Sequence, residues 1–233
     1  MRIETDQVAT TQPPRTQLKD EAAAHIRELI VSGQVPPGQL LRLAPLAERV
    51  GASVTPVREA LLLLAQDGWV TQEPNRGFRV LEITRKDVGD TYLVQSYICG
   101  ELAARAAAGI DSDQISVLRL IDAEINAHTD DDAGFLERAN YNLHDAIYAA
   151  AEADRLVWFV RSASRFVPRR FWGMIPGWLE HNRSGHAPVI AALAEHDAEG
   201  ARKAMSSHIA FAGELLLDHL DAISYWSTAP SDG

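Results

Sequence analysis

The chain has 233 residues, 46% of them hydrophobic, and a formal net charge of -10. This length suffices for one large or two ordinary domains with a real core, and no stretch approaches the roughly 20 consecutive apolar residues of a membrane span. The single cysteine, Cys99, excludes an internal disulfide framework, and we therefore expect a protein of the reducing cytoplasm.

The chain is expected to begin with a disordered tail over residues 1–17, which are polar and lack the apolar core of a signal peptide. Residues 18–32 predict an amphipathic helix, because apolar residues recur on one face, and Gly33 ends it. The apolar face consists of Leu18, Ala22, Ile26, Leu29 and Ile30.

Residues 44–69 have the pattern of a short helix, a tight turn and a second helix. Leu46, Ala47 and Val50 give the first helix an apolar face. Gly51 ends this helix, since glycine adopts the left-handed backbone of a helix C-terminus at low cost.

The second helix of this pair has Ser53 or Thr55 as its candidate N-cap, and Pro56 suits its first turn. Arg58 points away from the apolar face near the N-terminus, where a helix-turn-helix places side chains against DNA bases and phosphates. The apolar face consists of Val57, Ala60, Leu61, Leu64 and Ala65.

A β-hairpin is predicted after the two helices. A strand-like run starts at Gly68, residues 74–77 form a turn, and residues 78–80 alternate as a return strand. Two helices alone would suit any helical protein, but the order helix, turn, helix, hairpin favours a winged helix. Arg76 then lies at the tip of the wing.

The negative charge is concentrated in the second part of the chain. Residues 1–83 carry 9 basic and 10 acidic side chains, whereas the other 150 residues carry 13 basic and 22 acidic ones. A near-neutral first domain would bind DNA weakly on its own, because neutralisation of phosphates drives nonspecific binding, and a dimer would supply two copies. The arginines of the predicted helix-turn-helix and wing are Arg42, Arg49, Arg58, Arg76 and Arg79.

The segment 18–81 resembles the DNA-binding domain of the GntR family of bacterial transcription regulators. Val54 departs from the family, which usually has a basic residue there, and Ala44 stands where some members have arginine. The matching residues are Ile26, Ile30, Gly33, Pro37, Gly38, Leu41, Leu46, Ala47, Gly51, Ser53, the run Thr55 to Leu61, Leu64, Gly68, Asn75, Arg76 and Gly77.

This resemblance implies a homodimer that binds a palindromic double-stranded operator, with half-sites about one helical turn apart. The DNA-binding residues that it implies are Arg42, Ser53, Thr55, Arg58 and Arg76.

From Arg85 onward the pattern becomes purely helical. The sequence predicts a winged helix-turn-helix over 18–82, an all-α bundle of six or seven helices over 85–222, and a tail over 223–233. Thr84 is the candidate N-cap of the first bundle helix. The predicted helices lie near 85–108, 112–128, 132–151, 154–172, 186–196 and 198–222.

Three of the eight histidines stand at the head of apolar helical stripes. His144 follows Asn140 by four residues, so both project from one helix face, and His186 and His208 open similar stripes. A lone histidine is more often a surface or satisfied core residue. If the three imidazoles converge, however, they could bind Zn, Ni, Fe or Mn with open coordination positions.

Residues 85–220 resemble the FCD effector domain of the FadR-type branch of the GntR family. The resemblance implies a divalent metal bound by Asn140, His144, His186 and His208, and a small organic acid held by the metal. These ligands bring no negative charge, so an effector carboxylate would supply it. The matching segments are 140–144, His186 with Val189 and Ile190, 197–201, Met205 and His208.

The part of the pocket that binds the effector departs from the family. Ser96 and Gly100 stand where members often have an arginine and a glutamate four residues apart on the first helix of the domain. Arg161 and Arg165 are the candidate replacements, although a run of arginines on a helix is more often a solvated face.

The sequence therefore predicts a ligand-responsive transcription regulator. Two alternatives stay open at this stage: a regulator that senses the metal itself, and a metal-dependent enzyme. The enzyme lacks a convincing general base, because Glu137 and Asp145 lie off the face of Asn140 and His144 or at its edge.

Overall fold

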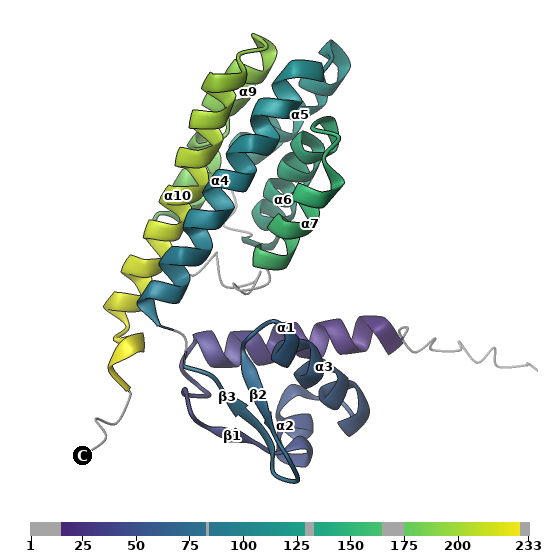
Figure 1. Ribbon diagram of the computed structural model, residues 1–233, viewed down its shortest axis with the longest axis vertical. Coiled ribbons are helices and arrows are strands. Elements are labelled where there is room, and N and C mark those ends of the chain that lie inside the picture. Colours follow the sequence, from purple (N-terminus) through teal and green to yellow (C-terminus); the bar gives the residue numbers. More distant parts are fainter. Residues whose placement is uncertain (1–14, 83, 129–132, 165–174, 229–233) are drawn as a thin grey trace, which may run out of the picture.

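The computed structural model describes residues 15–82, 84–128, 133–164 and 175–228. It is mainly α-helical, with a winged helix-turn-helix followed by a helical domain, as the sequence predicts (Figure 1). In the described part of the chain, no helix has the length and apolar character needed to cross a membrane.

The N-terminal domain combines three helices with a small sheet. Its first helix begins at Arg15, inside the range expected to be a tail. The buried residues Ile26 and Ile30 of this helix pack with Val57, Leu61 and Leu64 in one core. The elements are α1 (Arg15–Val31), β1 (Leu40–Leu41), α2 (Leu43–Val50), α3 (Val54–Gln66), β2 (Val70–Glu73) and β3 (Gly77–Val80).

The turn between α2 and α3 follows the prediction. Gly51 has φ +68° and ends α2. Ser53 is the N-cap residue of α3, although its side chain makes no capping hydrogen bond, and Pro56 lies in the first turn.

The sheet has the strand order β1-β3-β2, and both pairs are antiparallel. β1 was not predicted from the sequence, because a two-residue strand has no pattern of its own. Gly77 has φ +123°, and a Cβ there would lie 2.4 Å from the backbone oxygen of Leu41. Glycine is therefore required where the wing meets β1.

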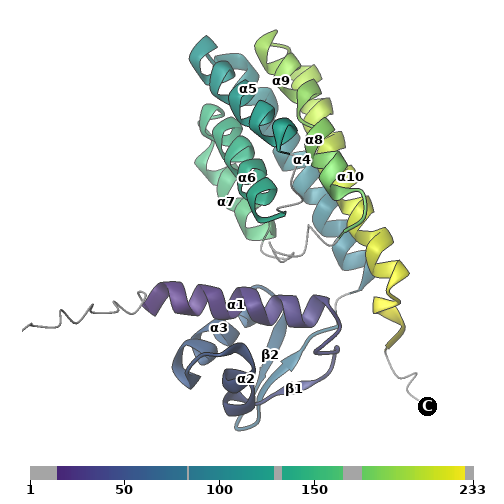
Figure 2. The ribbon, with the colours of Figure 1, turned by 180° about the vertical axis from the view of Figure 1, so that it is seen from behind.

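The helical domain is built around two long neighbouring helices, α4 and α10, which lie side by side in both views (Figures 1 and 2). Thr84 caps α4 as predicted, since its hydroxyl accepts a hydrogen bond from the Asp87 backbone N at 3.1 Å. The elements are α4 (Arg85–Gly109), α5 (Ser112–Ala127), α6 (Ala133–Ala150), α7 (Asp154–Ala163), α8 (Trp178–Ser184), α9 (Ala187–Ala194) and α10 (Ala198–Ala222).

The helical domain differs from the prediction in three places. The helix expected over 154–172 is described as α7 up to Ala163, and most of the remainder lies outside the described residues. No helix is predicted between Pro176 and Gly185, but α8 lies there. A short 3-10 helix, η3 (Tyr225–Thr228), falls in the range expected to be a tail, and its Tyr225 is buried.

Figures 1 and 2 also show how the two domains are placed. The helix α1 lies on the side of the N-terminal domain that faces the helical domain, and the tip of the β2–β3 hairpin lies on the opposite side. The wing is therefore directed away from the bundle.

Candidate metal centre and DNA-contacting surface

The three histidines of the predicted cluster come from three helices, α6, α9 and α10, and their side chains meet. His144 lies on α6, where Leu136, Leu143 and Ile147 are fully buried, so the packed side of α6 also carries the imidazole. His186 is the N-cap residue of α9 and has no exposed surface. His208 lies on α10, and like His144 it is buried.

The imidazoles converge on a common point. Each offers one ring nitrogen, and these nitrogens lie within 4.8 Å of one another. His186 Nε2 is 3.4 Å from His144 Nε2 and 3.0 Å from the side-chain oxygen of Asn140. Imidazole nitrogens and an amide oxygen are suitable ligands for a divalent transition metal. The four residues that share helical apolar faces in the sequence thus lie together in space.

A polar contact fixes the orientation of His144. Its Nδ1 lies 3.2 Å from the hydroxyl of Tyr148, and this hydroxyl lies 3.1 Å from the sulfur of Cys99. Since the hydroxyl occupies Nδ1, Nε2 is the nitrogen that faces the cluster. Burial raises the pKa of Cys99 to about 12, so the thiol stays protonated and is a packed group rather than a metal ligand.

The histidines of the cluster are neutral at pH 7. Burial, together with repulsion from neighbouring imidazoles, lowers the pKa of His144 and of His186 to about 3. The same causes hold the pKa of His208 well below its usual value. Each ring therefore has an unprotonated nitrogen that can act as a ligand.

The hydrogen bonding around the cluster is incomplete. His208 Nδ1 is buried and has no hydrogen-bond partner. A closed network of histidines would satisfy both nitrogens of each ring, because unpaired buried polar atoms are costly. The donor set therefore fits a bound cation better than it fits a purely structural network.

A fourth histidine, which the sequence did not suggest, packs against the cluster. The ring of His181 on α8 stacks on that of His208 with centroids 4.4 Å apart, and its Nε2 lies 3.0 Å from the His208 backbone oxygen. A Cβ at Gly185 would lie 2.4 Å from His208 Nδ1. Glycine thus lets the end of α8 approach this ring. The signal was missed because α8 itself was not predicted.

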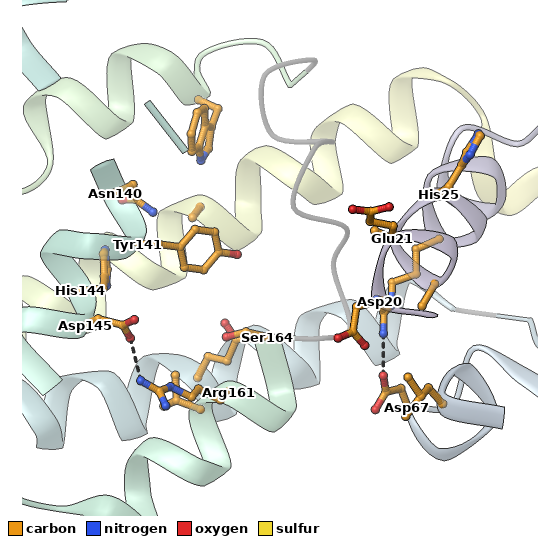
Figure 3. Close-up of a pocket in the computed structure, with 18 of the residues that line it drawn as sticks. Asp20, Glu21, His25, Asp67, Asn140, Tyr141, His144, Asp145, Arg161 and Ser164 are labelled. Carbon is orange, nitrogen blue, oxygen red and sulfur yellow. Dashed lines mark hydrogen bonds and ion pairs between the residues drawn. The ribbon is translucent and has the colours of Figure 1, made fainter. Parts of the chain in front are cut away.

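A cavity of about 1350 Å³ borders Asn140, His144 and His208 of the cluster and extends to the N-terminal domain. Figure 3 shows Asn140, Tyr141 and His144 at one end and α1, with Asp20 and Glu21, at the other. The histidine cluster is therefore open to a cavity that both domains line.

Of the two candidate arginines of the effector pocket, the structure describes only one. Arg161 lines the cavity, but its guanidinium is largely exposed and lies 3.3 Å from the carboxylate of Asp145 (Figure 3). Arg165 lies outside the described residues. The buried hydroxyl of Ser96 donates a hydrogen bond to the backbone oxygen of Leu93 at 2.8 Å, so Ser96 offers no charge in place of the usual arginine.

The predicted DNA-binding residues are all exposed. They are Arg42, Ser53, Thr55 and Arg58 at the N-terminal ends of α2 and α3, and Arg76 in the turn between β2 and β3. Arg79 differs from them, because its guanidinium pairs with Glu73 and donates to the backbone oxygen of Gly38 at 2.6 Å. We therefore regard Arg79 as a residue that stabilises the wing.

A winged helix-turn-helix joined to a helical domain with a buried histidine cluster defines a two-domain DNA-binding transcription regulator. The family model for bacterial regulatory proteins of the gntR family matches residues 18–80, and the model for the FCD domain matches residues 90–211. The chain belongs to the GntR family and carries an FCD domain.

Curated relatives of this chain are transcription regulators rather than enzymes. A probable repressor of the D-xylose utilization operon from Paenarthrobacter nicotinovorans is 26% identical over 203 residues, which cover 81% of this chain and 85% of the repressor. An HTH-type regulator of Agrobacterium vitis is 30% identical and aligns over 56% of this chain and 79% of its own length. The alignment with the regulator YdhC of Bacillus subtilis, 27% identical, spans 52% of this chain and only 55% of that protein.

Solved structures share the fold. The structure of McbR/YncC from E. coli aligns with a TM-score of 0.61 and 22% identity, over 91% of this chain and 99% of that one. A GntR regulator from Rhodococcus sp. RHA1 aligns with a TM-score of 0.55 and 21% identity, over 87% of this chain and 98% of that one.

Proposed function

We propose that this regulator binds a divalent metal ion through Asn140, His144, His186 and His208. The observation that carries the proposal is the convergence of three neutral, buried imidazoles beside a cavity. Zn, Ni, Mn and Fe all accept such ligands. The ion would fix the ring orientations and offer open coordination positions toward the cavity.

The effector in this proposal is a small organic acid. Asn140 and three neutral histidines carry no formal charge, so a divalent cation in the buried cluster lacks compensation, and a carboxylate from the cavity would provide it. Arg161 would meet a second anionic group of the effector if its pairing with Asp145 opened. Arg165 remains a candidate from the sequence alone.

The operator is bound by the exposed residues of the N-terminal domain. In the proposal, Arg42, Ser53, Thr55 and Arg58 contact bases and phosphates in the major groove, and Arg76 on the wing contacts the neighbouring backbone. Effector binding changes operator affinity only if the effector-free and the effector-bound protein favour different arrangements of the domains. The coupling free energy between two such sites is typically about 1–3 kcal/mol.

Palindromic operators require two copies of the chain. Exposed apolar side chains on the neighbouring helices α4 and α7 support a homodimer through the helical domain, because large exposed apolar side chains that gather on one surface often mark an interface. These side chains are Leu93, Val94 and Tyr97 on α4 and Trp158 and Phe159 on α7.

Metal analysis combined with operator binding tests the proposal. Protein purified without chelator and reloaded with Zn²⁺ is expected to bind the metal stoichiometrically, and His144→Ala is expected to lose the metal but keep its helical circular dichroism. A thermal-shift screen of organic acids with and without Zn²⁺ should then reveal ligands that act only on the loaded protein. Full metal content in His144→Ala would contradict the ligand assignment.

The same experiment separates two kinds of regulator. If Zn²⁺ alone changes operator affinity and no organic acid adds to the effect, the metal itself is the signal. If operator affinity changes only with acid and metal together, the acid is the effector and the metal is its binding site.

A further inference from the structure

A carboxylate lies on the far side of His186 from the other imidazoles. The side chain of Asp122 on α5 is 19% exposed, and its Oδ1 lies 3.9 Å from His186 Nδ1. Neither of these two atoms has a side-chain hydrogen-bond partner. The backbone of Asn182 is the other hydrogen-bonding group beside the His186 ring. The opposite nitrogen of the ring, Nε2, faces Asn140 and His144.

The tautomer of His186 decides whether these groups can be satisfied together. If Nε2 carries the proton, it donates to Asn140, and the lone pair of Nδ1 then faces the carboxylate of Asp122. If Nδ1 carries the proton, a closure of about 1 Å brings it to hydrogen-bond distance from Asp122. Nε2 is then unprotonated and can bind a metal ion.

A charge argument leads to the same tautomer. A histidine that ligates a metal commonly donates a hydrogen bond from its other ring N–H to a carboxylate. This hydrogen bond orients the ring and raises its basicity. Here the proposed ligands carry no negative charge of their own. A carboxylate directly behind one imidazole would partly compensate a buried divalent ion even before an effector binds.

We infer that Asp122 is a positioning residue of the metal centre. It accepts a hydrogen bond from Nδ1–H of His186, keeps Nε2 directed at the ion, and supplies a negative charge that the four ligands lack. The inference rests on the proposed metal-binding function, and it adds to this function a residue from α5, a helix that contributes none of the ligands.

Competitive titration with Zn²⁺ and a chromophoric chelator tests this role. Asp122→Asn is expected to weaken Zn²⁺ binding about 10–100-fold, as is typical when such a partner is lost. Two other carboxylates serve as controls: Glu124, exposed and two residues away on α5, and Glu137, buried on α6. Glu124→Gln and Glu137→Gln are expected to keep the Zn²⁺ affinity of the unmodified protein. Equal affinity in Asp122→Asn and the unmodified protein would overturn the inference.

Two further measurements distinguish positioning from a general structural effect. Asn140→Asp in the Asp122→Asn background returns one negative charge and is expected to recover part of the lost Zn²⁺ affinity. In the unmodified Zn²⁺-loaded protein, long-range ¹H–¹⁵N spectra are expected to show His186 protonated at Nδ1 and metal-bound at Nε2. The reverse assignment would overturn the inference without any variant.

Failure of the inference can be told from failure of the proposed function. If the unmodified protein and His144→Ala both fail to bind Zn²⁺, the metal-binding function is wrong, and with it the role of Asp122. If the unmodified protein binds Zn²⁺ and Asp122→Asn binds it equally well, only the role of Asp122 is wrong.

Discussion

At the scale of single residues, Arg58 and Arg76 have different surroundings on the DNA-binding domain. Arg58 is exposed on the first turns of α3, the helix that a helix-turn-helix inserts into the major groove. Arg76 lies on the wing, with its side chain 72% exposed and a guanidinium nitrogen 3.9 Å from Glu73. The two residues are therefore expected to contribute to operator binding in different ways.

Arg58→Ala is expected to cost about 1–3 kcal/mol of operator binding and to relax the preference at particular base pairs. Arg76→Ala should weaken binding to all sequences by a similar factor and reduce its salt dependence, as for a phosphate contact. Fluorescence anisotropy with the operator and with single-base variants measures both effects. Arg119→Ala, an exposed position on α5, serves as the control. Unchanged operator binding in both arginine variants would show that Arg58 and Arg76 do not contact the DNA.

The buried histidines predict a dependence of stability on pH. The pKa of His144 and His186 in the folded chain is about 3, below the value of about 6.5 in an unfolded chain. As the pH falls below 6.5, the unfolded chain takes up protons that the folded chain does not. The stability gained by burying neutral rings is therefore present above pH 6.5 and is lost toward pH 3, at up to about 1.4 kcal/mol per pH unit for each ring.

The melting temperature of metal-free protein in chelator is thus expected to fall between pH 7 and pH 5. The fall should be smaller in His144→Gln. Carboxylates also change the stability with pH. Arginine partners lower the pKa of Glu101, so its effect on stability falls below this pH range. Burial raises the pKa of Asp122, so Asp122 changes the stability in the opposite direction. A melting temperature that does not change over this range would contradict the prediction.

At the scale of helices, Gly100 is one of the residues that allow the close approach of α4 and α10. A Cβ at Gly100 would lie 2.1 Å from the hydroxyl oxygen of Ser206 and 2.9 Å from the backbone oxygen of Arg202. Because a backbone atom cannot move without shifting the helix, the added methyl group must separate the two helices.

Gly100→Ala is therefore expected to destabilise the protein by about 1–3 kcal/mol, despite the higher helix propensity of alanine. Gly89 lies on the same helix and would meet nothing within 4 Å. Gly89→Ala should instead stabilise by about 0.5–1 kcal/mol. Urea unfolding monitored by circular dichroism measures both variants, and equal effects of the two would show that packing at Gly100 is not the cause.

The same comparison of helices shows what the sequence could and could not predict. The spacing of Asn140 and His144 depends only on the period of one helix, so it could be read directly. Asp122 and His181 approach the cluster because α5 and α8 pack beside α6, α9 and α10, and no local pattern encodes this. α8 was missed because it is short and follows Pro176 and Gly177, which indicate a break.

At the scale of the whole molecule, the proposed dimer depends on the apolar surface of α4 and α7. Tyr97 is 70% exposed, and Leu93 lies one turn before it on the same helix with 54% exposed. A charge introduced at Tyr97 would have to be buried in a dimer, at a large cost.

Tyr97→Glu is expected to sediment as a monomer and to lose about 10²–10⁴-fold in operator affinity, because the two half-sites are then no longer bound by one particle. Leu120→Glu, at a similarly exposed position on α5, should leave the sedimentation of the protein unchanged. A dimer that persists in Tyr97→Glu would show that another surface holds the two chains together.

The short connection between the wing and the bundle also limits how far apart two bound half-sites can lie. Residues 81–84 alone join β3 to α4, and fully extended they reach about 14 Å. The start of α4 packs beside α10, and Arg85 there pairs with Asp221 of α10. An operator lengthened by one full turn of DNA, about 34 Å, keeps both recognition sequences on the same side of the duplex, yet two such tethers cannot span the added distance. The dimer of helical domains would then set a fixed spacing between the two half-sites of the operator.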